Sequence, residues 1–306
     1  MTVLEGRAVL EMAVVPEDGE RLWCENWAMQ MFASLPTRSS ARKAIKRGEI
    51  AVNGLVLEKS EPVGPGAELA RLEPTSGMPK AYDVPLKVLY EDAHIAAVHK
   101  PPGLAVNGTW HRTVEHALSS NLQPSTAPDA LRMPRPAHRL DRPTGGLLLV
   151  GKTATGLAGL SGLFHDRAVH KRYRAIVVGR IDGEGEVDTP VEGRAAHTRW
   201  SAVECTRSLR CDWITTVDLW PTTGRTHQLR RHMAGAGVPI LGDTVYGTQG
   251  CILRGKGLFL CAIALRFDHP ITGEAMDLFV DEPHKNHSMR LREARRWETH
   301  HPEPAA

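Results

Sequence analysis

The chain has 306 residues, of which 42% are hydrophobic and 24% charged, and this composition is typical of a soluble globular protein rather than of a disordered or fibrous one. The length predicts about two domains. The formal net charge of +3 is too small to indicate nucleic-acid binding by itself, so the distribution of charge matters more than its sum.

Three features of the sequence bear on its compartment. No apolar run approaches the roughly 18 residues needed to span a bilayer. Glu5 and Glu11 near the N-terminus argue against a signal peptide. The five cysteines are odd in number and include no C-x-x-C pair, which favours reduced thiols. We therefore expect a cytoplasmic protein with no membrane partner.

The first predicted elements lie in the N-terminal quarter of the chain. Apolar residues recur near helical spacing over residues 20–32 and predict a helix. Ser39 is the predicted cap of a second helix over residues 40–47, which Gly48 ends. Residues 50–57 predict two short strands joined by an Asn-Gly turn.

Ten residues at and just before the second predicted helix contain no acid and carry a basic cluster, made of Arg38, Arg42, Lys43, Lys46 and Arg47. In isolation, such a cluster is as often a solvated face as a binding surface. A helix, a basic helix and a hairpin in this order, with the string RSSARKAIKRGEIAVNG, resemble the RNA-binding module named after ribosomal protein four of the small subunit. The resemblance covers about residues 20–73, although Trp23 stands where the module usually has an acid. It implies phosphate contacts that depend on salt but not on base sequence.

Residues 73–85 are rich in Pro, Ser, Gly and Thr and predict a linker, after which the pattern becomes that of strands. The strand-like runs are 86–91, 95–99, 146–151, 173–178, 200–206, 214–220, 258–267 and 276–280. Short connections separate several of these runs, so we predict an α+β fold with a mixed, largely antiparallel sheet rather than a doubly wound one. Helices are predicted at 114–118, 154–166 and 226–235, a long loop at 119–136, and a short surface helix at 289–297.

Residues 138–146, HRLDRPTGG, place Asp141 on a turn ahead of an apolar run. A turn that opens into a buried strand is a rigid platform, from which a lone carboxylate can act as a nucleophile or a base. Asp also commonly closes turns before Pro and Gly, and for this motif alone that structural role is the better interpretation. Two distant segments change the balance.

These segments are KRYRAIVVG at residues 171–179 and GRTHQLRRHM at 224–233, the second followed by GDTVYG at 242–247. With HRLD before them, they resemble in content and order the RluA-type pseudouridine synthases, which isomerise uridine within folded RNA. KPPGLAV at 100–106 is similar to a further motif of that family, and the resemblance covers about residues 84–282. It implies no cofactor and structured ribosomal or transfer RNA as the partner.

The resemblance assigns roles to three residues. Asp141 is the expected catalytic carboxylate, and because a free Asp has a pKa of about 3.9, it is charged at neutral pH unless burial changes that. Arg230 is the expected cation beside Asp141, the alternative being a phosphate contact or a solvated helix charge. Tyr173 is expected to stack on the uracil ring, the alternative being a structural core tyrosine.

Three further residues are expected to contact the RNA. By resemblance, Arg139 helps to fill the stack that the target uridine leaves when it is flipped out, although a plain salt bridge is the alternative. Lys171 and Arg172 are expected to hold phosphates. We therefore expect an N-terminal RNA-binding module over residues 1–75, a linker over 76–85, a catalytic domain over 86–282 and a charged C-terminal tail over 283–306.

Two other functions remain open at this point. One is a catalytically silent RNA-binding or ribosome-assembly factor with the same fold, against which the set of Asp141, Tyr173 and Arg230 argues. The other is a nucleoside hydrolase or glycosylase that uses the same carboxylate, which the basic N-terminal module disfavours. We expect no metal, because no H-E-x-x-H is present and pairs such as His227 and His232 are five residues apart. We also expect a monomer without an obligate protein partner.

Overall fold

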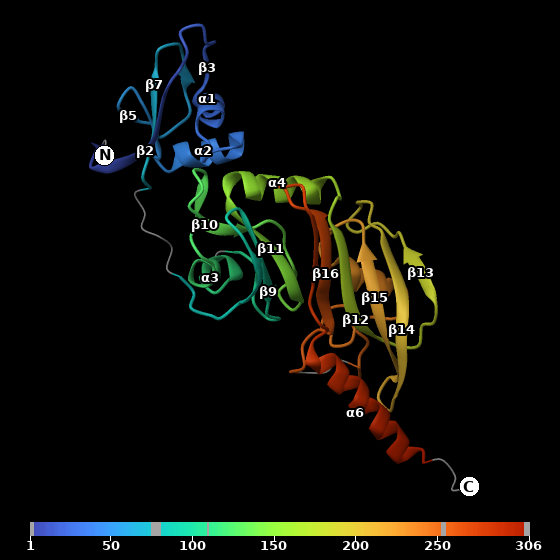
Figure 1. The fold of residues 1–306 in the computed structure, drawn as a ribbon. Helices are drawn as coiled ribbons and strands as arrows, with labels where there is room; N and C mark the ends of the chain where they lie inside the picture. Colours follow the sequence, from blue (N-terminus) through green and yellow to red (C-terminus); the bar gives the residue numbers. More distant parts are fainter. Residues whose placement is uncertain (1–2, 75–80, 109, 252–254, 303–306) are drawn as a thin grey trace.

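The computed structural model describes residues 3–74, 81–108, 110–251 and 255–302. Figure 1 shows a small N-terminal unit beside one end of a larger unit, which is built on a long twisted sheet. The two chain ends lie at opposite ends of the molecule, with the C-terminal helix farthest from the N-terminal unit.

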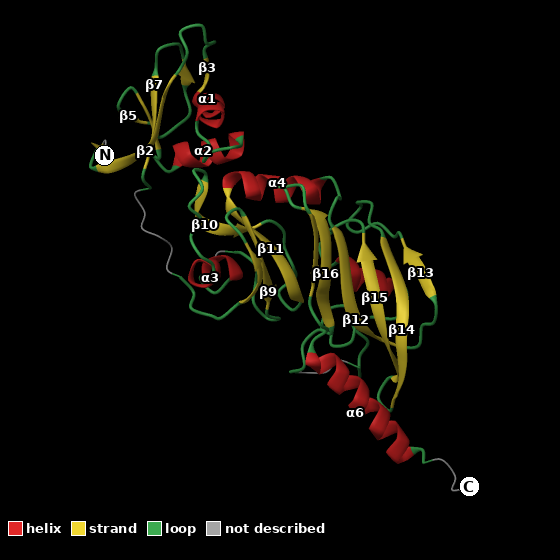
Figure 2. Cartoon of the chain, viewed as in Figure 1, coloured by secondary structure: helices red, strands yellow, loops and turns green. Residues whose placement is uncertain are grey.

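In the described residues, the large sheet has ten strands. Figure 2 shows its strands side by side in the larger unit. Eight of them follow one path, in the order β13 (Glu184–Val187), β14 (Thr198–Ser208), β15 (Asp212–Pro221), β12 (His170–Val178), β16 (Leu260–Asp268), β11 (Gly145–Thr153), β9 (Ile95–Lys100) and β8 (Lys87–Glu91). The other two are β10 (Ala130–Pro136), which pairs with β11, and β17 (Ala275–Phe279), which pairs with β16. The β11–β16 pair is parallel and the other pairs are antiparallel. The predicted α+β fold with a mixed, largely antiparallel sheet is therefore confirmed.

Helices cover both faces of this sheet. Alternate residues of β9 point to opposite faces, so Val98 packs in one cluster with α3 (Val114–Asn121) and Ala97 in another with α4 (Ala154–His165). Because β9 and β11 are buried on both faces, their sequences are nearly continuous apolar runs. Farther along the sheet, α5 (Gln228–Gly235) packs on β12 and β15.

Of the loop predicted at residues 119–136, residues 122–129 are confirmed and the two ends are wrong. Helix α3 continues to Asn121, whose side chain bonds the backbone of Val84 and Leu86, and the loop then leads into β10. The sequence did not predict β10 because the strand contains two prolines, and proline has no amide hydrogen to donate to a neighbouring strand. An edge strand that pairs irregularly with β11 tolerates them. Strand β13 was also not predicted, and α6 (His284–His300) is longer than the predicted 289–297.

The N-terminal unit combines two small sheets with two helices. The first sheet has the order β1 (Val3–Leu4), β2 (Arg7–Val14), β7 (Glu68–Leu72), β4 (Ile50–Val52) and β5 (Leu55–Val56). The second pairs β3 (Leu22–Trp23) with β6 (Pro62–Val63). Helices α1 (Cys24–Met31) and α2 (Arg38–Lys46) pack together around a core that includes Trp27, Phe32 and Ile45.

Two boundaries in this unit differ from the prediction. The first helix begins at Cys24 rather than at residue 20, because Leu22 and Trp23 pair with β6. The second helix is capped by Thr37 rather than Ser39: Thr37 Oγ1 accepts from the Ser40 amide and Ser40 Oγ accepts from the Thr37 amide, both at 3.1 Å. The predicted hairpin is confirmed.

Residues 76–80 of the predicted linker lie outside the described residues. Residues 81–85 have no regular secondary structure but pack on α3, since the Tyr82 amide donates to the His116 carbonyl. No helix in the described part of the chain is both long and apolar enough to cross a membrane.

Candidate active site

Asp141 lies on the turn that leads into β11 and lines a cavity of about 80 Å³. Arg139, Thr144, Tyr173 and Arg230 line the same cavity. The three predicted catalytic residues therefore reach one place from three segments that are far apart in the sequence. The turn itself is closed by the Thr144 amide, which donates to the Asp141 carbonyl at 3.0 Å.

The backbone after this turn can accept only glycine at one position. Gly146 has a φ of +116° and lies directly beside Ala262, where β11 and β16 run in parallel. A Cβ at Gly146 would lie 2.2 Å from the Ala262 carbonyl oxygen. This close approach fixes the turn that carries Asp141 against the centre of the sheet.

Lys100 stabilises the turn that carries Asp141 through hydrogen bonds. Its fully buried ammonium donates to three carbonyls: Leu104 at 2.6 Å, Pro101 at 3.0 Å and Arg142 at 3.1 Å. Burial lowers the pKa of Lys100 to about 8, although the nearby charge of Asp141 acts in the opposite direction. The lysine thus joins the loop after β9 to the loop that carries Asp141.

Arg230 faces two carboxylates. Its Nε and Nη2 donate to Asp243 at 2.7 Å each, a bidentate pair, whereas its Nη1 lies 3.7 Å from Asp141. The predicted pairing of Arg230 with Asp141 is thus present as the longer of two contacts. Asp243 belongs to the GDTVYG motif, and its role as the main partner of Arg230 was not predicted.

The Arg230–Asp243 pair is buried and keeps its charges. Burial alone would raise the pKa of Asp243, but hydrogen bonds from Arg230 and from the amides of Val245 and Tyr246 lower it below its usual value. Burial alone would lower the pKa of Arg230, but its bonds to Asp243 and the charges of Asp243 and Asp141 raise it. The pair is neutral as a whole, and its Arg230 guanidinium stays charged with Nη1 beside Asp141.

Three further polar side chains that line the cavity are Tyr173, His227 and Thr144. Burial, and then the charge of Asp141, raise the pKa of Tyr173, so its phenol stays protonated at neutral pH. His227 Nε2 lies 4.0 Å from Asp141, and its Nδ1 is 3.1 Å from the Tyr246 hydroxyl. Thr144 Oγ1 is buried and has no hydrogen-bond partner among the described residues, which leaves it able to bond a ligand in the cavity.

A second cavity of about 470 Å³ adjoins the first and shares Arg139 and Tyr173 with it. Lys171 lines this cavity, and burial followed by the charge of Arg167 lowers its pKa to about 8. His138 also lines it; burial lowers the pKa of His138 to about 3, so its Nε2 accepts from the Leu149 amide at 3.0 Å as a neutral ring.

The predicted RNA-contacting residues differ in their surroundings. Arg139 is exposed at the rim of both cavities, and Lys171 lines the larger one. Arg172 lines neither: its guanidinium bonds Asp218 and lies over Trp220, because neighbouring strand residues point to opposite faces. The phosphate contact expected of Arg172 thus competes with an ion pair.

The basic cluster on α2 also has partners. Arg42 and Arg38 lie 2.9 and 3.4 Å from the buried Glu25, and Arg47 lies 3.6 Å from Glu49. Lys43 and Lys46 are exposed on the same helix.

As for metals, the described residues contain no cluster of three or more His, Cys, Asp or Glu able to hold an ion.

Comparisons with known proteins identify the family of the chain. The family model for RNA pseudouridylate synthase matches residues 94–235. The ribosomal large subunit pseudouridine synthase D of Vibrio parahaemolyticus is 32% identical over 300 residues, covering 87% of this chain and 88% of the relative. The protein of the same name from Pseudomonas aeruginosa is 33% identical over 293 residues, covering 84% and 87%.

A solved structure supports the fold. Human RNA Pseudouridylate Synthase Domain Containing 1 superposes with a TM-score of 0.55 at 24% identity, covering 68% of this chain and 86% of that one. This structure supports the fold alone, whereas the two bacterial relatives, with at least 32% identity over most of both chains, show the family. The chain therefore belongs to the RluA-type family of RNA pseudouridine synthases, enzymes that isomerise uridine to pseudouridine in RNA.

Proposed function

We propose that this enzyme modifies uridine in the RNA of the large ribosomal subunit, with Asp141 as the carboxylate that acts on the target nucleotide. The observation that carries the proposal is the position of Asp141 in one cavity with Arg230 and Tyr173. The choice of RNA is supported by the relatives of similar length, which are named ribosomal large subunit pseudouridine synthase D. The enzyme acts as a cytoplasmic monomer.

The reaction makes three demands on the site. The bond between the uracil nitrogen and the ribose breaks, the uracil turns, and a bond from ring carbon 5 to the ribose replaces it. Carbon 5 releases its proton and the freed nitrogen takes one up, so the product is an isomer of uridine. Nothing is oxidised or reduced. The site needs a charged carboxylate to act on the nucleotide, a surface that retains the detached uracil, and exclusion of water, which would otherwise end the reaction as loss of the base.

Asp141 meets the first demand. Arg230 lies beside the Asp141 carboxylate, and its two hydrogen bonds to Asp243 keep it from forming a closer pair with Asp141. The Asp141 oxygens remain available to the nucleotide because their contact with Arg230 is the longer one. Tyr173 meets the second demand with a ring that can stack on uracil and a hydroxyl that stays protonated.

The target nucleotide must leave its helix to enter so small a cavity, which costs a few kcal/mol. Arg139 is exposed at the rim, where it can occupy the vacated stack and offset part of that cost. Lys171 is placed to hold a phosphate in the adjoining cavity.

Residues 1–75 act as an RNA-binding module in this proposal, followed by a linker at 76–85, the catalytic domain at 86–282 and the C-terminal tail. Lys43 and Lys46 of α2 and Arg47, which caps its C-terminus, are the phosphate contacts of that module, since all three side chains are exposed.

Release of tritium from carbon 5 of uridine tests the reaction and the role of Asp141. The wild-type enzyme should release label from large-subunit ribosomal RNA, and Asp141→Asn should abolish release while RNA affinity stays within a few-fold. Parallel loss of binding and turnover would make Asp141 structural. Free uracil would indicate hydrolysis, and tight binding by the wild type without release would indicate a silent binder. Release from transfer RNA alone would contradict the ribosomal substrate.

A further inference from the structure

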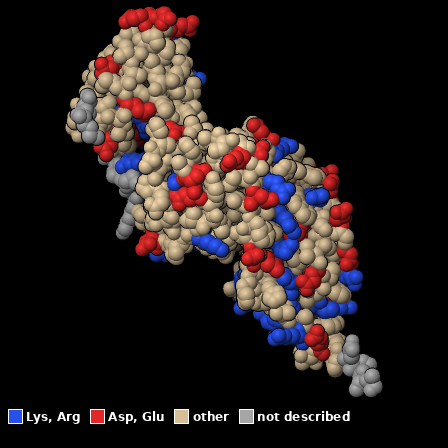
Figure 3. Space-filling view, in the orientation of Figure 1, with Lys and Arg blue, Asp and Glu red and all other residues tan. Residues whose placement is uncertain are grey.

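Helix α6 carries the whole positive excess of the chain. Five of its 17 residues are Lys or Arg and two, Glu293 and Glu298, are acidic, which leaves a surplus of three. This surplus equals the formal net charge of +3 of the full sequence, so the rest of the chain is neutral on balance. Figure 3 shows blue side chains gathered over this end of the molecule.

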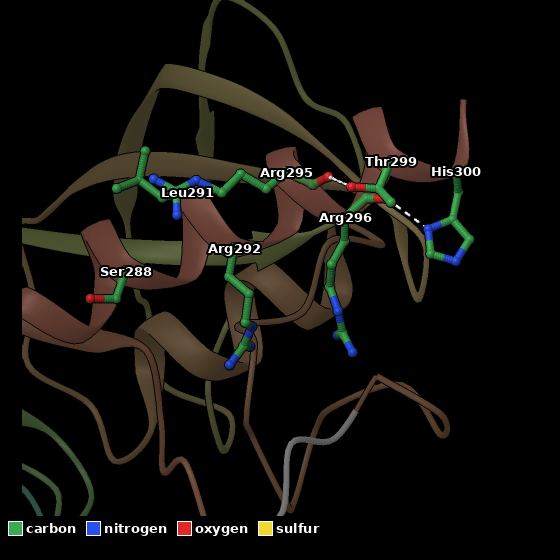
Figure 4. Close-up of a pocket in the computed structure, with 7 residues that line it drawn as sticks. All are labelled: Ser288, Leu291, Arg292, Arg295, Arg296, Thr299 and His300. Atoms are coloured by element: carbon green, nitrogen blue, oxygen red, sulfur yellow. Dashed lines mark hydrogen bonds between the residues drawn. The ribbon is translucent and has the colours of Figure 1, made fainter. Parts of the chain in front are cut away.

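Three of the arginines share one face of α6. Arg292, Arg295 and Arg296, with Leu291 and His300, recur at helical spacing and line a surface hollow of about 420 Å³. We call these five residues the arginine face. In Figure 4 the guanidinium groups of Arg292 and Arg296 project from the same side of the helix. All five side chains are exposed.

The opposite face holds α6 rigidly against the large sheet. Met289 is buried, Glu293 accepts a hydrogen bond from Ser208 of β14 at 2.7 Å, and Arg290 pairs with Glu204 of β14 at 3.0 Å. Because these contacts anchor α6 at residues 289–293, next to Arg292, a ligand on the arginine face would not have to order this part of the helix first.

The charges of the arginine face are only weakly compensated. Glu293 lies 3.5 Å from Arg292 Nε and 3.8 Å from Arg296 Nη1, and the same carboxylate accepts from Ser208. One partly occupied carboxylate thus serves two exposed guanidinium groups, and such surface pairs are weak and screened by salt. The face keeps a positive excess that an anionic partner can use.

We propose that the arginine face binds the sugar–phosphate backbone of the RNA substrate, away from the nucleotide that enters the Asp141 cavity. This inference rests on the RNA substrate of the proposed function. Guanidinium groups bind phosphate oxygens in bidentate geometry, and three of them within about two helical turns can follow a backbone. Leu291 adds an apolar contact for a sugar or a base edge.

The test compares two variants that lose the same charge. The first replaces Arg292, Arg295 and Arg296 with Gln. The control replaces the exposed residues Lys87, Arg180 and Arg266 with Gln on other elements. The arginine-face variant should bind ribosomal RNA about tenfold more weakly at physiological salt, and the slope of log affinity against log salt should fall by about 2, since each phosphate contact contributes about 0.7 to 0.9. The control should change both quantities little.

Turnover separates this site from the catalytic one. At saturating RNA, the arginine-face variant should release label at the wild-type rate, and only its KM should rise. The proposal would be overturned if the control variant lost as much RNA affinity as the arginine-face variant. It would also be overturned if the arginine-face variant kept the salt slope of the wild type, a result that would leave an acidic protein as the partner of this face. If the wild type releases no label, the proposed function fails, while the binding comparison still decides whether the face contacts RNA. The single variant Arg295→Gln, with a slope change of about 1, serves if the triple variant does not fold.

Discussion

A buried carboxylate orients arginine side chains in two regions of this molecule, and the regions differ in what surrounds the arginine. In the cavity, Asp243 (0% exposed) holds Arg230, whose side chain is 5% exposed. On the N-terminal unit, Glu25 (2% exposed) holds Arg42, whose side chain is 59% exposed. The buried Arg230 is held in one position by Asp243 and faces Asp141, whereas the exposed Arg42 has room to leave Glu25 for another anion. In the proposed function, the same pair of charges would position a catalytic group in one region and leave an arginine free to bind phosphate in the other.

The largest expected effect on stability comes from a change in the backbone at Gly146, next to the cavity. The buried Arg230 region depends on this backbone, and the exposed Glu25 region does not. Gly146→Ala should destabilise the protein by about 4 kcal/mol or prevent folding, since its Cβ would meet the Ala262 backbone at 2.2 Å. Gly145→Ala is the matched control, because its nearest neighbour, a proline Cδ, lies 3.3 Å away. Urea unfolding measures both; equal stabilities would show that β16 can move aside, and that the turn is not rigidly held.

Removing each carboxylate tests the comparison directly. Asp243→Asn should cost about 3 kcal/mol and lower the rate of label release, because it leaves a buried cation short of its main partner. Glu25→Gln should cost about 1 kcal/mol, because Arg38 and Arg42 stay solvated and the amide can still hydrogen-bond. Thermal unfolding at neutral pH gives the two losses, and similar values would break the distinction between the regions.

The pH dependence of the stability of Asp243→Asn shows whether the loss of stability comes from the lost charge. The pKa of Asp243 is lowered in the folded protein, so its contribution to stability is complete above the unfolded pKa of about 4 and is lost as pH falls through the folded pKa. The stability gap between the wild type and Asp243→Asn should therefore narrow below about pH 4. A gap that stays constant on acidification would point to lost packing instead of lost charge.

The smallest expected effect concerns an uncharged group in the cavity. Thr144→Val should leave the free energy of unfolding unchanged or raise it by up to about 1 kcal/mol, because the buried hydroxyl has no partner among the described residues. Thr37→Val is the contrasting change on α2, where loss of the cap should destabilise by about 1 kcal/mol. Destabilisation by Thr144→Val would mean that its hydroxyl already serves the fold.

The sequence predicted the class of fold and the meeting of Asp141, Tyr173 and Arg230 because strand runs and motif order carry that information. It did not predict Asp243 as the main partner of Arg230, since that contact depends on how a loop folds back over α5. The alternation of β12 already placed Arg172 on the face opposite Tyr173, but the ion pair with Asp218 became visible only with β15 beside it. Strand β10 stayed hidden because its prolines oppose a strand, and only its edge position permits them.

The parallel pairing of β11 with β16 also governs when the enzyme becomes competent during its synthesis. A ribosome that has translated all three motifs has still not made Ala262, the residue against which Gly146 is set. Until that late strand emerges, the growing polypeptide carries every reactive group without the support that arranges them, and such long-range closure is intrinsically slow. A product truncated before β16 would thus retain the signature motifs and lack activity.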